Sequence, residues 1–448
     1  MSEETMLNSL NIPIRYKKHL LMQSLSTSST DSHIKKQIAT LKINNKKLLP
    51  HWCKQLIMFP IQNICNKNTN NPDVSIIVGG KEFDFLNLSN TSKNIELNNF
   101  ENIINYLLFE RYFLHKRALF TRLPFSYNLI PPFFRNMIRK TNLKKKIDID
   151  NDINTSINTN SNKALKNKFR FPTWPVEPSV DVLRYLLEKA LEIKTGRKSN
   201  HWPNNNKCCF IATHDMETET SFRNISVIRE IEKRYNFNSS WNVLSNKYNL
   251  NFKKLNILVK DGCEIGIHGY NHDGKLSFLN KKGVAKRLNH AKTTFARFKP
   301  TSFRSPILMR NESFLKELSN YFECDSSVPD TDILSPLAKR SGCCTVFPFM
   351  INNMVEVPLT LPQDYRLIYT LNLNPNKMLK LWKEKVNYIY NVGGIINILT
   401  HPDDYLTGNE RYLRVYERLL HYISKKEDVY HDTISNVARG WKEKMYSK

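Results

Sequence analysis

Two histidines, four residues apart, form the stretch of this chain best suited to chemistry. His268 and His272 follow a short apolar run and stand beside glycines. Residues at i and i+4 share one face of a helical turn, so both imidazoles could reach one divalent cation. Flanking glycines suit a turn that presents both rings at the end of a strand. A zinc site needs a third protein ligand. The alternative is a chance pairing of two of the 12 histidines.

Two carboxylates stand at the end of another apolar run. Asp215 and Glu217 follow Cys208–Ala212, where a carboxylate could bind a metal or act as a general base. Taken alone, an acid at this place is better explained as the N-cap or first-turn residue of a helix.

An arginine and a further histidine also follow strand-like or helical stretches. Arg304 lies in Phe303–Pro306 and could keep a carboxylate ionised and oriented, although a surface arginine is the ordinary alternative. His401 closely follows the apolar run Ile395–Leu399. A histidine aimed at the same pocket would act as a general acid, but a single histidine there carries little information.

Strand-like and helical stretches alternate from Lys207 onward, which predicts a parallel sheet or barrel. In such folds catalytic groups collect where strands end. The expected strands are Cys208–Ala212, Ser239–Val243, Glu264–Ile267 and Ile395–Leu399, and the expected helices are Phe222–Tyr235, Asn251–Lys260, Lys281–Phe298, Glu312–Asn320 and Lys377–Asn391.

The order of these groups resembles the polysaccharide deacetylase family, the NodB-type group of carbohydrate esterase family 4. Gly266–His272 resembles its zinc-binding motif, Phe303–Pro306 its arginine motif, and Leu399–His401 its last motif with the acid histidine. The resemblance covers roughly Lys207 to the C-terminus. Four further stretches resemble an uncharacterised bacterial branch of this family: Cys324–Ser327, Gly342–Phe349, Glu356–Asp364 and His401–Tyr405.

This resemblance implies a distorted (β/α) barrel and metal-dependent removal of the N-acetyl group from an amino sugar. The substrate would be a polysaccharide, a cell-surface glycan or its precursor, and the metal would be zinc, with cobalt or manganese as alternatives. The implied roles are His268, His272 and Glu217 as metal ligands, Asp215 as base, His401 as acid, Arg304 orienting Asp215, and Asp325 positioning the loop or His401.

The chain departs from the family pattern in two places. Met216 stands where the common first motif has a second aspartate. By analogy with members whose carboxylates are separated by one residue, Asp215 is the base and Glu217 the ligand, and the reverse assignment stays open. The usual Tyr-Gly after the arginine motif is Ile307-Leu308, so Ile307 can offer an oxyanion only its backbone amide.

The composition is strongly basic. Lys+Arg 67 against Asp+Glu 41 gives a net charge of +26, which favours anionic partners such as a membrane surface or an acidic glycan. Asn-Lys-rich stretches offer compositional bias as an equal explanation, and no specific nucleic acid is expected. The eight cysteines show no CxxC spacing, and neither a signal peptide nor a membrane-spanning run is evident. We expect a cytoplasmic protein, or one peripheral at the inner face of the membrane.

Three regions are expected along the chain. Residues 1–146 form an α+β accessory region that is a candidate for membrane or partner association, 147–170 a polar linker, and 171–448 the catalytic domain, with its motif core at 207–405. The accessory region should contain two short strands in Val74–Phe85 and a helix over Asn98–Phe120. Phe120–Lys146 mixes apolar and basic residues and could lie in a membrane interface, although its prolines favour a packed segment. A helix is expected over Val180–Ile193, with Ser179 as its N-cap.

Two other functions remain open. A different metal-dependent C–N hydrolase could act on a small non-sugar amide, which a closed pocket without aromatic sugar platforms would favour. A non-catalytic glycan- or membrane-binding protein could use the same fold, and Met216 is the residue that keeps this alternative open.

Overall fold

The centre of the molecule is a curved sheet whose neighbouring strands are parallel, except for the antiparallel pair β9–β10. The computed structural model describes residues 40–43, 74–78, 81–86, 100–112, 172–185, 188, 200–333 and 340–446. The strand order is β11-β4-β5-β6-β7-β8-β10-β9, and β12 also pairs with β4. The strands are β4 (Cys208–Met216), β5 (Ser239–Val243), β6 (Glu264–Ile267), β7 (Ser302–Phe303), β8 (Cys324–Asp325), β9 (Phe349–Ile351), β10 (Met354–Glu356), β11 (Ile395–Thr400) and β12 (Val429–His431).

The segment after β10 bridges the sheet back to β11. The backbone amides of Thr360 and Leu361 donate to the Asn397 carbonyl at 3.2 and 3.0 Å. The Asn397 side chain donates to Ser326 Oγ and to the Pro358 carbonyl, both at 3.0 Å. The sheet thus curls toward closure, and the expected distorted (β/α) barrel is confirmed.

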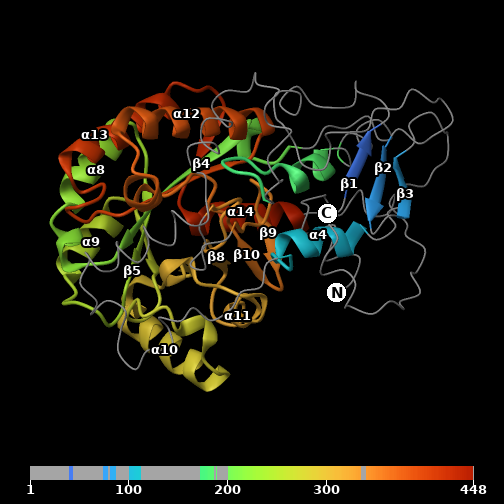
Figure 1. Cartoon of the computed structure of the whole chain (residues 1–448). Coiled ribbons are helices and arrows are strands. Elements are labelled where there is room, and N and C mark those ends of the chain that lie inside the picture. The colour runs from blue at the N-terminus through green and yellow to red at the C-terminus, as the bar shows by residue number, and fades with distance from the viewer. Residues whose placement is uncertain are drawn as a thin grey trace.

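Helices cover the outside of this barrel (Figure 1). α12 shows how the sequence forms them: Asn374 caps its first turn by accepting from the Lys377 amide, and Gly393 (φ 86°) ends it. Its apolar stripe includes Trp382, which is fully buried. The helices are α8 (Ile225–Arg234), α9 (Phe252–Lys260), α10 (Lys281–Thr294), α11 (Glu312–Leu318), α12 (Pro375–Val392), α13 (Glu410–Ser424) and α14 (Ile434–Tyr446).

The described part of the N-terminal region contains an antiparallel sheet and one helix. β2 (Val74–Val78) pairs with β1 (Thr40–Ile43) and with β3 (Lys81–Leu86), which confirms the two expected strands (Figure 1). The helix expected over Asn98–Phe120 is present as α4 (Phe100–Leu108), but it ends at Leu108, earlier than predicted. The Phe120–Lys146 segment and the 147–170 linker lie outside the described residues, so the domain boundaries stay predictions.

Residues 104–112 pack directly on the barrel. Leu107 and Phe109 belong to the same buried core as the central strands, and the Phe109 ring meets Phe349 edge to face at 6.5 Å. The Tyr112 hydroxyl donates to the Gly342 carbonyl at 2.5 Å. This part of the expected accessory region therefore shares a core with the expected catalytic domain.

Several predicted boundaries were wrong. β4 does not stop at Ala212 but continues to Met216, because these residues pair with β5 on one side and, as far as His214, with β11 on the other. The helix predicted to begin at Phe222 begins at Ile225, after a short 3₁₀ turn. Ser179 lies within the first helical residues, 179–185, instead of preceding them. Among the described helices, none is long and apolar enough to cross a membrane.

Candidate active site

Three side chains converge where β4 and β6 end. Ligand-type atoms of Glu217, His268 and His272 all lie within 4.8 Å of one another. Glu217 Oε1 is 2.7 Å from His272 Nε2 and 4.0 Å from His268 Nε2. The structure therefore brings together the three residues expected to hold a metal.

The two histidines do not share a helical turn, so the geometric reason given for their spacing was wrong. After β6 the chain forms an irregular loop in which Gly269 has a φ of 71° and His272 a φ of 60°. A Cβ at position 269 would come within 2.9 Å of the Pro306 ring, so this turn requires glycine. The positive φ values turn the chain back and bring the second imidazole to the first.

The donor chemistry of His268 suits a metal ligand. Its Nδ1 lies 3.0 Å from the Arg304 carbonyl, which fixes the tautomer with the proton on Nδ1. Its Nε2 is buried and has no hydrogen-bond partner among the described residues. A divalent cation binds an unprotonated imidazole nitrogen together with other histidine and carboxylate ligands. His268 Nε2, His272 and Glu217 therefore fit such an ion.

Strand geometry explains how two carboxylates separated by one residue reach the same place. Side chains alternate along β4, so Asp215 and the following Glu217 point to one side and Met216 to the other. Met216 is fully buried, and its carbonyl accepts from the Tyr248 hydroxyl at 2.6 Å. Met216 is therefore a core residue and does not occupy a ligand position.

Asp215 is held as a carboxylate beside this cluster. Its Oδ1 accepts from the Asn242 amide at 2.8 Å and lies 3.8 Å from the Arg304 guanidinium, while its Oδ2 is 3.7 Å from His268 Nε2. Burial alone would raise the pKa of Asp215. Its electrostatic interactions with His268, Arg304 and His401 and the Asn242 hydrogen bond outweigh burial, so the pKa is lowered.

Glu217 is the accessible member of the cluster, with 22% of its side chain exposed against 9% or less for the two histidines. Its Oε1 also lies 3.6 Å from His401 Nε2. Burial would raise the pKa of Glu217, but its interactions with His272 and its contacts with His268 and His401 lower it well below its usual range. Glu217 thus faces both the two histidines and solvent.

His401 is held by a carboxylate that the sequence did not reveal. His401 Nδ1 lies 2.6 Å from Asp364 Oδ1, and its backbone amide donates to Asp364 Oδ2 at 2.8 Å. Burial would lower the pKa of His401, but Asp364 and Glu217 raise it well above its usual value. Asp364 lies in the stretch Glu356–Asp364, which carried a family resemblance but no assigned role.

Arg304 and Asp325 are buried next to the site and hold its loops through hydrogen bonds. The fully buried Arg304 donates to Thr213 Oγ1 at 3.2 Å and Ser326 Oγ at 3.1 Å. Asp325 accepts from the Ser327 hydroxyl at 2.7 Å, and that hydroxyl accepts from the Ser305 amide at 2.8 Å. Asp325 therefore braces the loop after Arg304, while the alternative role of positioning His401 belongs to Asp364.

Comparison with known proteins finds solved structures that are similar to this chain at low sequence identity. No protein-family model matches the chain, and no curated protein matches it. A structure from Mycobacterium smegmatis, named as a polysaccharide deacetylase, is 17% identical with a TM-score of 0.46 and covers 55% of this chain and 94% of its own. One from Pseudomonas aeruginosa PAO1, with the same name, is 15% identical with a TM-score of 0.43, covering 57% and 98%. Puue allantoinase is 13% identical with a TM-score of 0.42, covering 56% and 96%.

Proposed function

We propose that this chain is a metal-dependent deacetylase that hydrolyses the N-acetyl group of an amino sugar in a polysaccharide, a cell-surface glycan or its precursor. The observation that carries the proposal is one cluster, in which Glu217, His268 and His272 converge between Asp215 and His401. A ligand set flanked by a base and an acid is what hydrolysis of an unactivated amide requires.

Each residue has a defined task in this reaction. A divalent cation, zinc or alternatively cobalt or manganese, would supply Lewis-acid polarisation and lower the pKa of water. Asp215, oriented by Arg304 and Asn242, takes the proton from the attacking water. The Ile307 amide would be the backbone donor that stabilises the oxyanion. His401, kept protonated by Asp364, gives its proton to the departing nitrogen, so the C–N bond breaks and acetate and an amine leave.

Metal content and acetate release together test this proposal. Purified wild-type protein should contain one equivalent of metal and release acetate from an N-acetylhexosamine glycan or precursor. His272→Ala and Glu217→Ala should lose both, while Glu219→Ala, at an exposed glutamate two residues away, should lose neither. Metal loss in the histidine variant alone would move the ligand role to Asp215. Wild-type protein that stays free of metal after reconstitution would disprove the proposal.

The two alternatives make different predictions in the same experiment. A C–N hydrolase for small non-sugar amides would bind metal yet release nothing from any sugar substrate. A non-catalytic binding protein would show no turnover of either class. Met216 is buried on the other side of β4 from Asp215, so its presence removes no ligand from the cluster, and this weakens the non-catalytic alternative.

A further inference from the structure

A buried carboxylate that the proposed reaction does not use joins the two loops that carry Glu217 and His401. Asp403 follows His401 by two residues and is fully buried. Its Oδ1 accepts hydrogen bonds from the hydroxyl of Thr218 and, at 3.0 Å, from that of Ser221. Both hydroxyls belong to the segment that directly follows Glu217, so Asp403 connects the loop after β11 with the loop after β4.

Glu217 depends on its neighbours for its position. The pairing of β4 with β5 ends at Met216, so Glu217 is the first residue beyond the strand. On one side of it, the Met216 carbonyl accepts from the Tyr248 hydroxyl at 2.6 Å. On the other side, the Thr218 hydroxyl donates to Asp403. Loss of the Asp403 carboxylate would therefore release one of the two neighbours that hold Glu217.

The turn that contains Asp403 also holds His401. The Asp403 backbone carbonyl accepts from the Gly408 amide at 3.1 Å, and the His401 carbonyl accepts from the Thr407 amide at 3.1 Å. A Cβ at position 408 would lie 2.3 Å from the Pro402 carbonyl oxygen, so the turn requires glycine there. The backbone of this turn fixes the Asp403 carboxylate relative to His401.

Core packing alone does not explain a carboxylate at this position. Asp403 Oδ2 is buried and has no hydrogen-bond partner among the described residues. A buried carboxylate that is only partly hydrogen-bonded costs stability, and an apolar side chain would avoid that cost. What the carboxylate adds is a fixed connection between two groups of the site, since Glu217 Oε1 and His401 Nε2 are only 3.6 Å apart.

We propose that Asp403 is a positioning residue that holds Glu217 beside His401 through the hydroxyls of Thr218 and Ser221. This inference rests on the proposed function, since it takes Glu217 as a metal ligand and His401 as the acid. It adds that metal affinity and turnover both depend on a carboxylate that is not itself a member of the ligand cluster.

Metal affinity, measured without any substrate, tests the inference. Protein freed of metal would be titrated with Co²⁺, and the visible absorption of the bound ion would be followed. Asp403→Ala should bind Co²⁺ about 10- to 100-fold more weakly than the wild type, the usual cost of losing a group that orients a metal ligand. Asp403→Asn should keep most of the affinity, because its amide oxygen still accepts from the hydroxyls. Equal affinity of the wild type and Asp403→Ala would overturn the inference.

A double-variant cycle separates positioning from a general loss of stability. Thr218→Val should also weaken Co²⁺ binding, and the variant with both Thr218→Val and Asp403→Ala should bind no more weakly than Asp403→Ala alone, because both changes remove the same contact. Losses of affinity that multiply in the double variant would overturn the inference.

A buried hydroxyl at the opposite end of the sheet supplies the control. Ser240, near the start of β5, donates to Glu264 at the start of β6 at 2.9 Å. Ser240→Ala should lower the free energy of unfolding in urea and leave the Co²⁺ affinity unchanged. If Ser240→Ala weakens Co²⁺ binding as much as Asp403→Ala does, the effect is one of stability and the inference is overturned.

Kinetics at saturating Co²⁺ test the connection to His401. Asp403→Ala should lower kcat by about 10²-fold, the cost of displacing a reacting group by about 1 Å, with little change in KM for the sugar. A wild-type kcat in this variant would overturn that connection. If the wild type binds Co²⁺ but hydrolyses no sugar, the proposed reaction fails, and the Co²⁺ affinities alone decide the role of Asp403. A wild type that binds no metal would disprove both.

Discussion

At the scale of single residues, the function of His401 depends on its neighbour Asp364. One carboxylate oxygen faces the imidazole, while the other accepts from the His401 amide and from the Thr407 hydroxyl at 2.6 Å. Asp364 is fully buried, so these contacts are not weakened by solvent. The carboxylate therefore both orients the ring and stabilises its protonated form.

The substitution Asp364→Asn should lower kcat by about 10²-fold, the typical contribution of a positioned general acid, because the imidazolium loses its counter-charge. The bound metal should remain, since Asp364 does not face Glu217, His268 or His272. Acetate release and metal content of the same preparation check both statements.

A surface carboxylate supplies the control. Asp261→Asn removes an acid that pairs with Lys233 at 2.7 Å outside the site, and it should leave kcat unchanged. An Asp364→Asn protein with wild-type kcat would show that His401 does not act as the acid, or acts without this partner.

At the scale of elements, the end of α4 is anchored to the loop that follows Arg304. Glu110 pairs with Arg310 through two contacts of 2.7 and 2.5 Å, and each side chain is 2% exposed. Arg310 also donates to the Leu308 carbonyl at 2.8 Å. Ile307 and Leu308 have φ values of 60° and 54°, so this loop is strained and needs an external brace.

Replacing Glu110 with alanine should therefore destabilise the fold by about 3–5 kcal/mol, because it leaves the buried Arg310 charge uncompensated. The free energy of unfolding in urea measures this. Glu110→Ala should also lower kcat, because the loop that Arg310 holds carries the Ile307 amide, the proposed donor to the oxyanion.

The neighbouring residue provides a matched comparison. Arg111 pairs with Glu312 at 2.8 Å on the surface, where its side chain is 43% exposed. Arg111→Ala should cost no more than about 1 kcal/mol, as exposed ion pairs do. Equal losses in the two variants would mean that the Glu110 pair does not anchor α4.

Sequence patterns predicted the elements better than the contacts between them. Alternating apolar runs located β5 and β6 at their observed bounds, because hydrophobic periodicity is a local property. The extension of β4 through His214 and Asp215 could not be predicted, since polar residues join that strand only by pairing with β5 and β11.

The site shows the same limit. The order of the residue types at 215, 217, 268, 272 and 401 predicted that these side chains share one site, and the structure brings them together. Asp364 and Glu110 gave no such indication, because each acts through a partner that is distant in sequence. The glycines predicted a turn at the end of β6, but the positive φ of His272 could not be predicted, since it is not encoded by spacing.

At the scale of the whole molecule, one buried carboxylate connects a strand of the barrel with two of the surrounding helices. Glu232 of α8 lies 2.7 Å from His214 of β4 and accepts from the Tyr416 hydroxyl of α13 at 2.8 Å. Burial would raise the pKa of Glu232, but His214, Arg229 and Ser239 lower it from 4.5 to about 2. This carboxylate therefore contributes stability only in its ionised form.

Acid should weaken the fold through this group. Because the folded pKa is depressed, the contribution is fully present above pH 4.5 or so and is lost as the pH falls toward 2. The loss amounts to about 3 kcal/mol between these limits, from 1.36 kcal/mol per pKa unit. Urea unfolding at pH 7 and pH 3 should show that Glu232→Gln is less stable at pH 7 and varies less with pH. Glu230→Gln, at an exposed position of the same helix, should follow the wild type.

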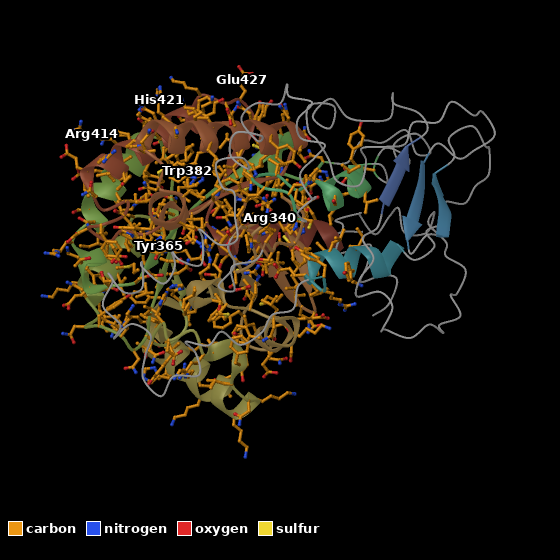
Figure 2. All side chains as sticks on the ribbon, in the orientation of Figure 1. Arg340, Tyr365, Trp382, Arg414, His421 and Glu427 are labelled. Carbon is orange, nitrogen blue, oxygen red and sulfur yellow. The ribbon has the colours of Figure 1, made fainter. Side chains whose placement is uncertain are left out.

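The net charge of +26 is also a property of the whole chain. On α13 the exposed Arg411, Arg414 and Arg418 outnumber the two glutamates, Glu410 and Glu417. Figure 2 labels Arg414 and His421 at the outer edge of the layer that contains α12 and α13. Such a field would attract an anionic membrane surface, which was one of the partners expected from the composition.

The full chain should therefore sediment with vesicles that contain phosphatidylserine and stay in solution with vesicles of phosphatidylcholine alone. Raising the salt to 1 M shortens the Debye length from about 10 Å to about 3 Å, so it should release the protein. Acetate release from a soluble oligosaccharide should change little under the same salt, because the buried charges of the site are screened much less. Equal binding to both kinds of vesicle would exclude an electrostatic contact. Binding to neither would favour compositional bias as the origin of the lysines, and the site would then act on substrates met in solution.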